Sequence, residues 1–192
     1  MDFADIVCAR RSIRRYMQKE ISDGDLRRLV DFARIAPSGK NGQNLRFCVI
    51  RKPELAEKVF AETAWAGFIA PRRTPVWGKD APAAFIALTV KKEAFNMTVA
   101  ADSGAAIENI LLGAVSLGLG GCWIGAFNKA NVHELLALPD DVECLYLVAL
   151  GYPAEEPLLE DTDDPENLRY YLDEDDRLHV PKLSVDELTT WL

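Results

Sequence analysis

The chain has 192 residues, 49% of them hydrophobic and 27% charged, which fits one domain with a sizeable core and excludes wholesale disorder. Its formal net charge of −8 argues against nucleic acid as the main partner. The four cysteines form no C-x-x-C pair, so we expect no metal site, and reduced thiols in a cytoplasmic protein. The acidic N-terminus lacks the apolar core of a secretory signal.

The first part of the chain alternates between helical and turn-forming patterns. The predicted elements are helices at 2–9, 22–36 and 53–63, a turn-rich loop at 37–44 and a strand at 45–50. Residues 65–78 hold two prolines, two tryptophans and two glycines, so we expect an irregular segment there, either a lid or a dimer arm.

The stretch from Thr98 to Phe127 is the central feature of the sequence. It predicts a helix of about 20 residues that is apolar on more than one face, and such a helix is buried on nearly all sides. Glycines end this helix, and a buried strand is predicted at 122–127. Within that strand, Gly125 indicates the close approach of a ligand or of another backbone.

Two other interpretations of this stretch stay open. Residues 109–128 carry no formal charge over roughly the length that spans a bilayer. Five glycines, together with Asp102 and Glu108 just upstream, disfavour a membrane span, and we expect no membrane partner. The other interpretation is an ordinary core helix without a functional partner.

The remaining elements complete a small sheet between helices. Two apolar runs, at 83–90 and 144–151, predict strands that are central in the sheet because both of their faces are buried. Later predicted elements are a helix at 131–138 with Glu134 at the capping-box position, a turn of helix at 165–172, an extended run at 178–182 and a capped helix at 184–192. We see no repeat or linker, so one domain over residues 1–192 is expected.

Arginines cluster near the start of the chain. In an extended geometry the side chains of Arg10, Ser12 and Arg14 would point to one side, and two guanidinium groups with a hydroxyl suit a phosphate. The alternative is that these arginines are solvated and stabilise the C-terminal end of a helix.

The loop at 37–43 offers a second set of polar groups. Ser38, Asn41 and Gln43 supply donors and acceptors that suit the polar edge of a flat heterocycle, although an ordinary polar loop has the same composition. The backbone around Gly125 adds amides with little side chain in the way.

Three motifs in this order resemble the FMN-dependent nitroreductase family. They are R-R-S-x-R from Arg10, A-P-S-G-x-N-x-Q from Ala36 and G-L-G-G-C-W-I-G-A-F from Gly118. The run H-V-P-K from His179 is similar to the family's basic tail, so the resemblance covers essentially the whole chain.

The resemblance implies an α+β fold, with a central, mostly antiparallel sheet flanked by helices, and an intertwined homodimer with FMN at the subunit interface. It implies an FMN-dependent NAD(P)H nitroreductase-type oxidoreductase. A hydride would pass from NADH or NADPH through flavin N5 to an electron-poor acceptor, such as a nitroaromatic or a quinone, in a ping-pong scheme.

The resemblance also assigns cofactor contacts. They are Arg10, Arg11, Ser12 and Arg14; Pro37, Ser38, Gly39, Asn41 and Gln43; Ile124, Gly125 and Ala126; and Lys182. The first group would hold the phosphate and the pyrimidine edge of the flavin, and the second would approach from the other subunit. The third would offer a backbone amide to N5, and the lysine would help to neutralise the phosphate. No catalytic side chain is implied, and His133 and His179 are interpreted as surface and structural residues.

The chain departs from the family pattern at two positions. The loop continues Gln43-Asn44-Leu45 where Gln-Pro-Trp is usual, so the local backbone and the wall of the pocket are expected to differ from the family pattern. Leu183 follows Lys182 where a second basic residue is usual, which implies weaker phosphate binding or compensation by Arg169 or Arg177.

Alternative functions stay open. Another flavin reaction on the same fold, such as dehalogenation, enone reduction or flavin fragmentation, would use the same pocket. A non-catalytic FMN-binding protein would keep the pocket without turnover. A small nucleic-acid-binding module is disfavoured by the net charge. The absence of a G-x-G-x-x-G fingerprint leaves the choice between NADH and NADPH undecided.

Overall fold

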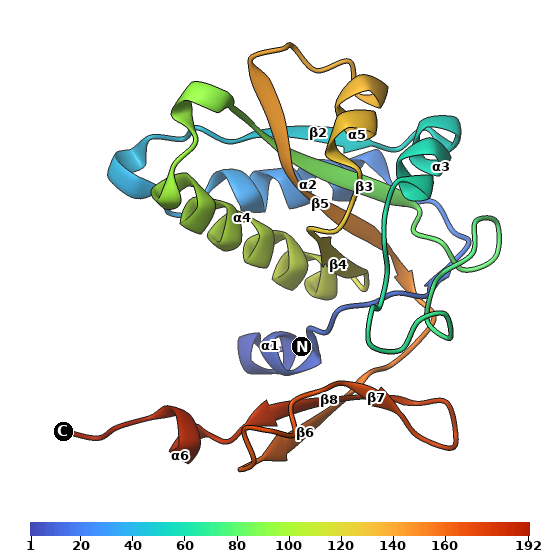
Figure 1. Ribbon diagram of the computed structural model, residues 1–192, viewed down its shortest axis with the longest axis vertical. Coiled ribbons are helices and arrows are strands. Elements are labelled where there is room, and N and C mark those ends of the chain that lie inside the picture. The colour runs from blue at the N-terminus through green and yellow to red at the C-terminus, as the bar shows by residue number, and fades with distance from the viewer.

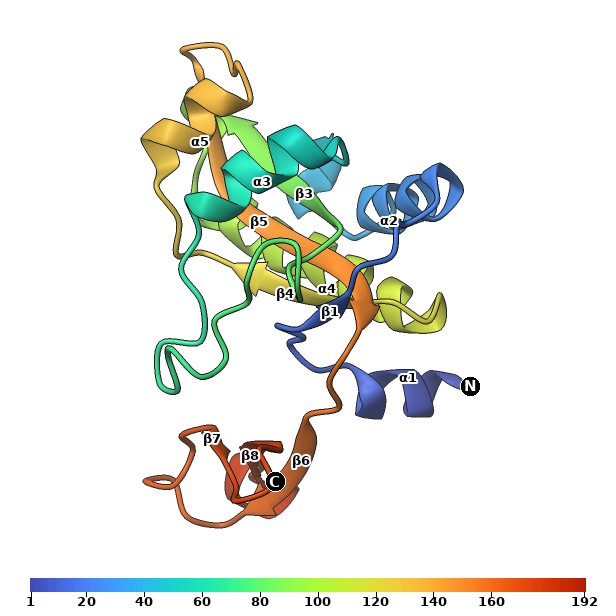
Figure 2. The ribbon, with the colours of Figure 1, turned by 90° about the vertical axis from the view of Figure 1, so that its right-hand side faces the viewer.

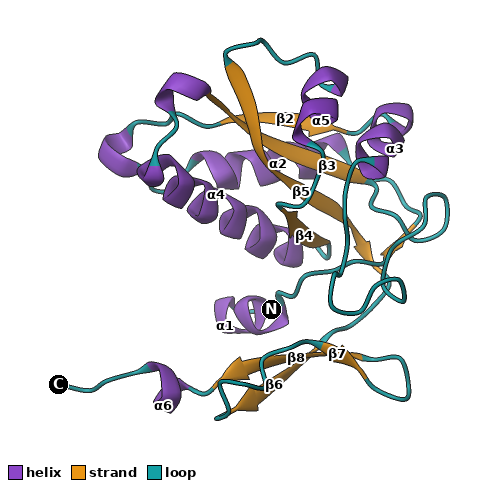
Figure 3. Cartoon of the chain, viewed as in Figure 1, coloured by secondary structure: helices purple, strands orange, loops and turns teal.

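The computed structural model describes residues 1–192 and is built around a five-stranded antiparallel sheet (Figures 1 and 3). Its strands are β1 (Tyr16–Met17), β2 (Arg46–Ile50), β3 (Ala84–Lys91), β4 (Gly120–Ile124) and β5 (Val142–Pro153). The helices are α1 (Phe3–Ala9), α2 (Asp23–Arg34), α3 (Pro53–Ala61), α4 (Met97–Ser116), α5 (Lys129–Leu135) and α6 (Val185–Leu188), with short 3-10 turns at Gly39–Asn41 and Lys92–Ala94. Strand β5 pairs with β1, β3 and β4, and β2 pairs with β3. The predicted α+β class is confirmed.

Helices cover both faces of this sheet (Figure 2). Along β3, Phe85 and Ala87 belong to the core beneath α3 and α5, whereas Ile86 and Leu88 belong to the core beneath α2 and α4. Successive side chains of a strand point to opposite faces, so a strand covered on both sides is apolar throughout. The prediction of central, doubly buried strands is therefore confirmed.

Helix α4 is the longest helix and lies against the sheet (Figure 1). Asn96 caps it, because its side chain accepts a hydrogen bond from the N–H of Val99 at 3.1 Å. Within the single chain the predicted burial on nearly all sides is incomplete, because Ala101 and Glu108 leave one side of α4 exposed. No helix is both long enough and apolar enough to cross a membrane.

A second, three-stranded sheet follows the main one and lies beyond α1 (Figures 1 and 2). Its strands are β6 (Leu158–Thr162), β7 (Tyr171–Leu172) and β8 (Leu178–Leu183), with β6 and β8 parallel. We call it the C-terminal sheet. It confirms the extended run at 178–182, but the predicted turn of helix at 165–172 is wrong, because its last two residues form β7.

Three predicted boundaries also differ. The strand predicted at 122–127 spans 120–124, because its first two glycines pair with β5. The helix predicted at 131–138 begins at Lys129, since the side chain of Asn128 accepts from the N–H of Asn131 and serves as the N-cap. The last helix is a single turn, and Ser184 makes no capping hydrogen bond. The segment 65–78 is irregular, as predicted.

Candidate functional site

The arginine motif runs beside β4. Helix α1 ends at Ala9, and the chain then reaches β4, where Ser12 forms a parallel bridge with Gly121. The N–H of Ile13 donates to the carbonyl of Gly121 at 3.0 Å. A Cβ on Gly120 would lie 2.6 Å from the Ile13 side chain, so glycine is needed for this close approach. The structure therefore brings the first and third motifs together.

The three arginines of the motif have different partners. Arg10 Nε lies 3.3 Å from Glu108 Oε1 on α4, and the guanidinium of Arg14 lies 5.1 Å from the ring centre of Tyr170. The predicted convergence of Arg10 and Arg14 is therefore not seen, because residues 10–14 do not form a regular strand.

Arg11 has a structural role within the chain. It is buried, and it donates to the carbonyls of Cys8, at 2.8 Å, and Arg10. These carbonyls lie at the end of α1, so Arg11 caps this helix as the alternative interpretation expects, but it is buried rather than solvated. Burial, and then the charge of Arg10, lowers the pKa of Arg11.

The end of β4 presents free backbone amides. Ile124 is buried, whereas Gly125 and Ala126 are exposed. Neither of their N–H groups donates a hydrogen bond within the chain, although the carbonyl of Ala126 accepts from Ala64 at 2.9 Å. A Cβ on Gly125 would be 3.8 Å from the nearest atoms of Tyr146, so the approach to these amides is open. Such donors suit an electron-rich atom of a ligand.

The loop at 37–43 has an unusual backbone. Lys40, Asn41 and Gln43 have positive φ angles of 54°, 53° and 48°, a conformation that L-residues rarely adopt and that is frequent at functional sites. The N–H of Gln43 donates to Ser38 Oγ at 3.3 Å.

The buried carboxylate of Asp102 on α4 anchors this loop by accepting from the N–H of Gly39 at 3.0 Å. A Cβ on Gly39 would lie 2.2 Å from Thr98, which explains the glycine. Asp102 was not predicted as a site residue, because a single acid in an apolar helix gives no functional signal.

A cavity of about 220 Å³ lies between this loop and α2. The residues that line it include Pro37, Ser38, Gln43, Asn44 and Leu45 of the loop and Phe47 of β2. Asn44 and Leu45, the two residues that depart from the Gln-Pro-Trp pattern, therefore lie in the wall of this cavity. Pro37 and Asn41, both predicted contacts, lie in the same loop, and Asn41 is exposed.

The loop and the arginine motif lie at different places along α4. Asp102 holds the loop, and Glu108, six residues later, pairs with Arg10. Six residues correspond to about 9 Å of helix. Within one chain, the loop at 37–43 and the arginine motif therefore lie apart from each other.

Lys182 lies on β8, is exposed, and forms no ion pair. Its register partner in the C-terminal sheet is Asp161. Of the two arginines expected to compensate for Leu183, Arg177 is engaged with Asp173 at 2.7 Å, and Arg169 lies over the ring of Phe68 at 4.6 Å.

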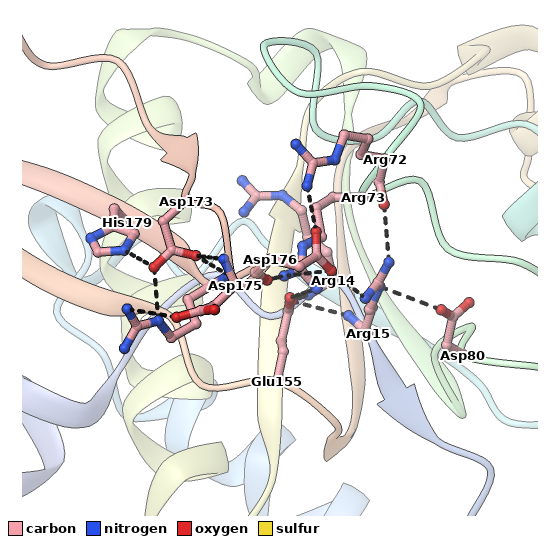
Figure 4. A network of polar contacts seen from close by, with 11 residues as sticks. Arg14, Arg15, Arg72, Arg73, Asp80, Glu155, Asp173, Asp175, Asp176 and His179 are labelled. Atoms are coloured by element: carbon pink, nitrogen blue, oxygen red, sulfur yellow. Dashed lines mark hydrogen bonds and ion pairs between the residues drawn. The ribbon is translucent and has the colours of Figure 1, made fainter.

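Two residues beside the motif gave no signal in the sequence. One oxygen of Glu155 accepts hydrogen bonds from the N–H groups of Arg14 and Arg15, and the other faces Arg73 (Figure 4). Glu155 is 141 residues from Arg14, and Arg73 lies in the irregular segment. No local pattern connects residues that only the fold brings together.

The two histidines match their predicted roles in position. On the surface of α5, the Nε2–H of His133 donates to the carbonyl of Pro139 at 3.1 Å. His179 lies between Asp173 and Glu160 in the C-terminal sheet and stacks on Tyr171. Its hydrogen bonds to Asp173 and then to Glu160 raise the pKa of His179.

Comparison with known proteins identifies the family. The model of the Nitroreductase family matches residues 7–152. A protein of Archaeoglobus fulgidus, provisionally named NADH dehydrogenase/NAD(P)H nitroreductase, is 33% identical over 184 residues, which cover 92% of this chain and 96% of the relative.

Solved structures agree. A nitroreductase family protein from Clostridium novyi NT has a TM-score of 0.69 and 28% identity, with 80% of this chain and 86% of that chain covered. A provisionally named nitroreductase from Desulfovibrio desulfuricans, in complex with FMN, has a TM-score of 0.66 and 29% identity, with 81% and 88% covered. The predicted nitroreductase-like fold is confirmed, and the chain belongs to the nitroreductase family.

Proposed function

We propose that this chain transfers a hydride from NADH or NADPH, through FMN, to an electron-poor small molecule such as a nitroaromatic or a quinone. The family is one of FMN-dependent oxidoreductases, and a relative of the same fold is bound to FMN. The proposal covers the acceptor class and the ping-pong order.

The free amides of Gly125 and Ala126 carry the proposal. They lie at one end of β4, and the other end of this strand is tied to Ser12 and Ile13. From Gly121 to Gly125 the strand spans about 13 Å. This span separates the proposed phosphate contacts from the free amides. The donor set therefore fits a cofactor that has an anionic end and an electron-rich ring atom at the other.

The protein residues would bind and orient rather than exchange protons. Arg10 and Ser12 would hold the phosphate, and the N–H groups of Gly125 and Ala126 would donate at flavin N5. FMN, when bound, supplies the hydride chemistry, so no acid or base side chain is required. The acceptor would take the place vacated by the nicotinamide.

A homodimer would complete this site. The residue of α4 that holds the loop at 37–43 lies about 9 Å before the residue that pairs with Arg10, toward the N-terminal end of the helix. A second copy packed against the exposed side of α4, at Ala101 and Glu108, would bring its own loop to the motif. We therefore place the proposed FMN site at a subunit interface, with Lys182 contributing to the charge at the phosphate.

The test is the absorbance spectrum of the purified protein with FMN, before and after anaerobic addition of NADH or NADPH. We expect saturable FMN binding and bleaching by at least one nucleotide, followed by recovery of the flavin spectrum when a nitroaromatic or a quinone is added. Binding without bleaching would favour a non-catalytic FMN-binding protein. No binding would overturn the proposal. Light scattering of the same sample measures the molar mass and shows whether the protein is a dimer.

A further inference from the structure

Glu155 and Arg73 form a buried ion pair beneath the arginine motif. Glu155 follows β5, Arg73 lies in the segment 65–78, and their side chains are only 6% and 5% exposed. Arg73 Nη1 lies 3.3 Å from Glu155 Oε2. A buried charge needs compensation, and Arg73 is the one cation in ion-pair distance of Glu155, so Glu155 depends on Arg73.

The other oxygen of Glu155 holds the backbone of the motif. Glu155 Oε1 accepts from the N–H of Arg14 at 2.5 Å and from the N–H of Arg15 at 3.1 Å. One oxygen that receives two successive N–H groups fixes the direction of the chain between them. The side chains of Arg14 and Arg15 then point to different partners.

Arg15 and Arg14 are separated by this arrangement (Figure 4). Arg15 turns toward Asp80, at 3.6 Å, and Asp176, at 3.4 Å. Arg14 has no ion pair and lies over the ring of Tyr170. The carboxylates of this network therefore occupy Arg15, Arg72 and Arg73 and leave the charge of Arg14 available.

We propose that Glu155, held by Arg73, is a positioning residue for FMN binding, because it fixes the backbone of Arg14 and thereby aims the guanidinium at the flavin. The inference rests on the proposed function, since it takes FMN as the ligand. Glu155 itself contacts only protein groups and takes no part in the hydride transfer.

Two double variants separate the acceptor oxygen from the buried charge. E155Q/R73M and E155L/R73M both remove the ion pair, but only the first keeps an oxygen that accepts the two N–H groups. FMN affinity is measured by fluorescence quenching. We expect E155Q/R73M to bind within about threefold of the natural protein, and E155L/R73M to bind at least about tenfold more weakly, the change typical of a lost charged hydrogen bond.

A second readout distinguishes positioning from loss of stability. The midpoint potential of the bound FMN should fall in E155L/R73M, because the charge of Arg14 moves away from the flavin edge. A general loss of folding free energy would not change this potential. As a matched control, D176N removes a carboxylate of the same network that contacts Arg15, Arg72 and Arg73 but no atom of Arg14. We expect its FMN affinity to stay within about threefold of the natural value.

The outcomes are separable. If the natural protein binds no FMN, the proposed function fails first, and this inference with it. If the natural protein binds FMN and folded E155L/R73M binds it equally well at an unchanged potential, only the inference is overturned. If E155L/R73M does not fold, the variant E155D tests the inference in its place. It keeps the charge opposite Arg73 but withdraws the oxygen from the backbone, so unchanged affinity in E155D would also overturn the inference.

Discussion

The main sheet and the C-terminal sheet are stabilised in different ways. The main sheet lies between two apolar cores, each with 15 buried residues, and its central strand β3 is almost entirely buried. The C-terminal sheet has few buried side chains, with Leu178 the main apolar one, and ionised groups connect its strands. Apolar burial is insensitive to pH, whereas ion pairs depend on protonation and salt. The two sheets should therefore respond to different perturbations.

The largest expected effect is on the main sheet. Phe85 on β3 is fully buried, and replacing it with alanine leaves a cavity beneath α3 and α5. We expect Phe85→Ala to lower the free energy of unfolding by about 3–5 kcal/mol. Urea unfolding followed by circular dichroism measures this change. Leu159→Ala on β6, a position that is 46% exposed, is the control, and we expect less than about 0.5 kcal/mol there. Equal losses would contradict the comparison.

The proposed phosphate contacts come from both regions and should contribute unequally. Arg10 follows α1 and is half-buried, whereas Lys182 is exposed on β8. We expect Arg10→Ala to weaken FMN binding by about 1.5–3 kcal/mol, the range for a hydrogen bond to a charged group. Lys182→Ala should cost less than about 1 kcal/mol, because solvent screens an exposed charge. FMN titrations of the two variants measure the difference, and an unchanged affinity of Arg10→Ala would remove this residue from the site.

The same contrast explains what the sequence could predict. The apolar run at 83–90 predicted β3 almost to the residue, because a doubly buried strand has a distinctive composition. Strands β6 and β7 were not predicted. Leu158–Thr162 reads L-L-E-D-T, which does not alternate apolar and polar residues, and β7 has only two residues. A sheet held by ion pairs leaves little apolar periodicity in its sequence.

The site was predictable to the extent that its groups are local. The motifs from Arg10, Ala36 and Gly118 each lie in one short stretch, and the structure places the first beside the third. Arg11 shows that residue type alone does not identify a ligand contact, because its guanidinium donates to a carbonyl at the end of α1. Glu155 and Asp102 act on backbone N–H groups that are distant in sequence, and such contacts depend on the fold rather than on any motif.

Tight backbone packing in the main sheet gives a third test. Gly151 on β5 faces Tyr16, and a Cβ there would lie 2.6 Å from the ring and 3.0 Å from the Tyr16 Cβ. We expect Gly151→Ala to destabilise the protein by about 1–3 kcal/mol through overpacking. Gly67→Ala is the matched control, because a Cβ at that position meets nothing within 4 Å. Thermal unfolding of the pair measures the effect, and the comparison fails if both melt alike.

The smallest effect should be confined to the C-terminal sheet and should depend on pH. Its hydrogen bonds raise the pKa of His179 above its ordinary value of 6.5. A raised folded-state pKa stabilises the fold below the ordinary value, and this stabilisation is lost as the pH rises through the raised value. The hydrogen bond from His179, followed by those from Arg177, lowers the pKa of Asp173 well below 3.8. Its contribution is present above 3.8 and is lost as the pH falls toward the lowered value.

The C-terminal sheet should therefore be most protected between about pH 4 and pH 6.5. Amide hydrogen exchange, corrected for its intrinsic pH dependence, measures this protection strand by strand. Raising the pH from 5.5 to 8.5 should speed exchange in β8 and leave β3 unchanged, since β3 depends on apolar burial. His179→Gln should remove the pH dependence of β8, because glutamine does not titrate. A parallel change in β3 and β8 would mean that one cooperative unit, rather than an ion-paired sheet, sets the stability of both.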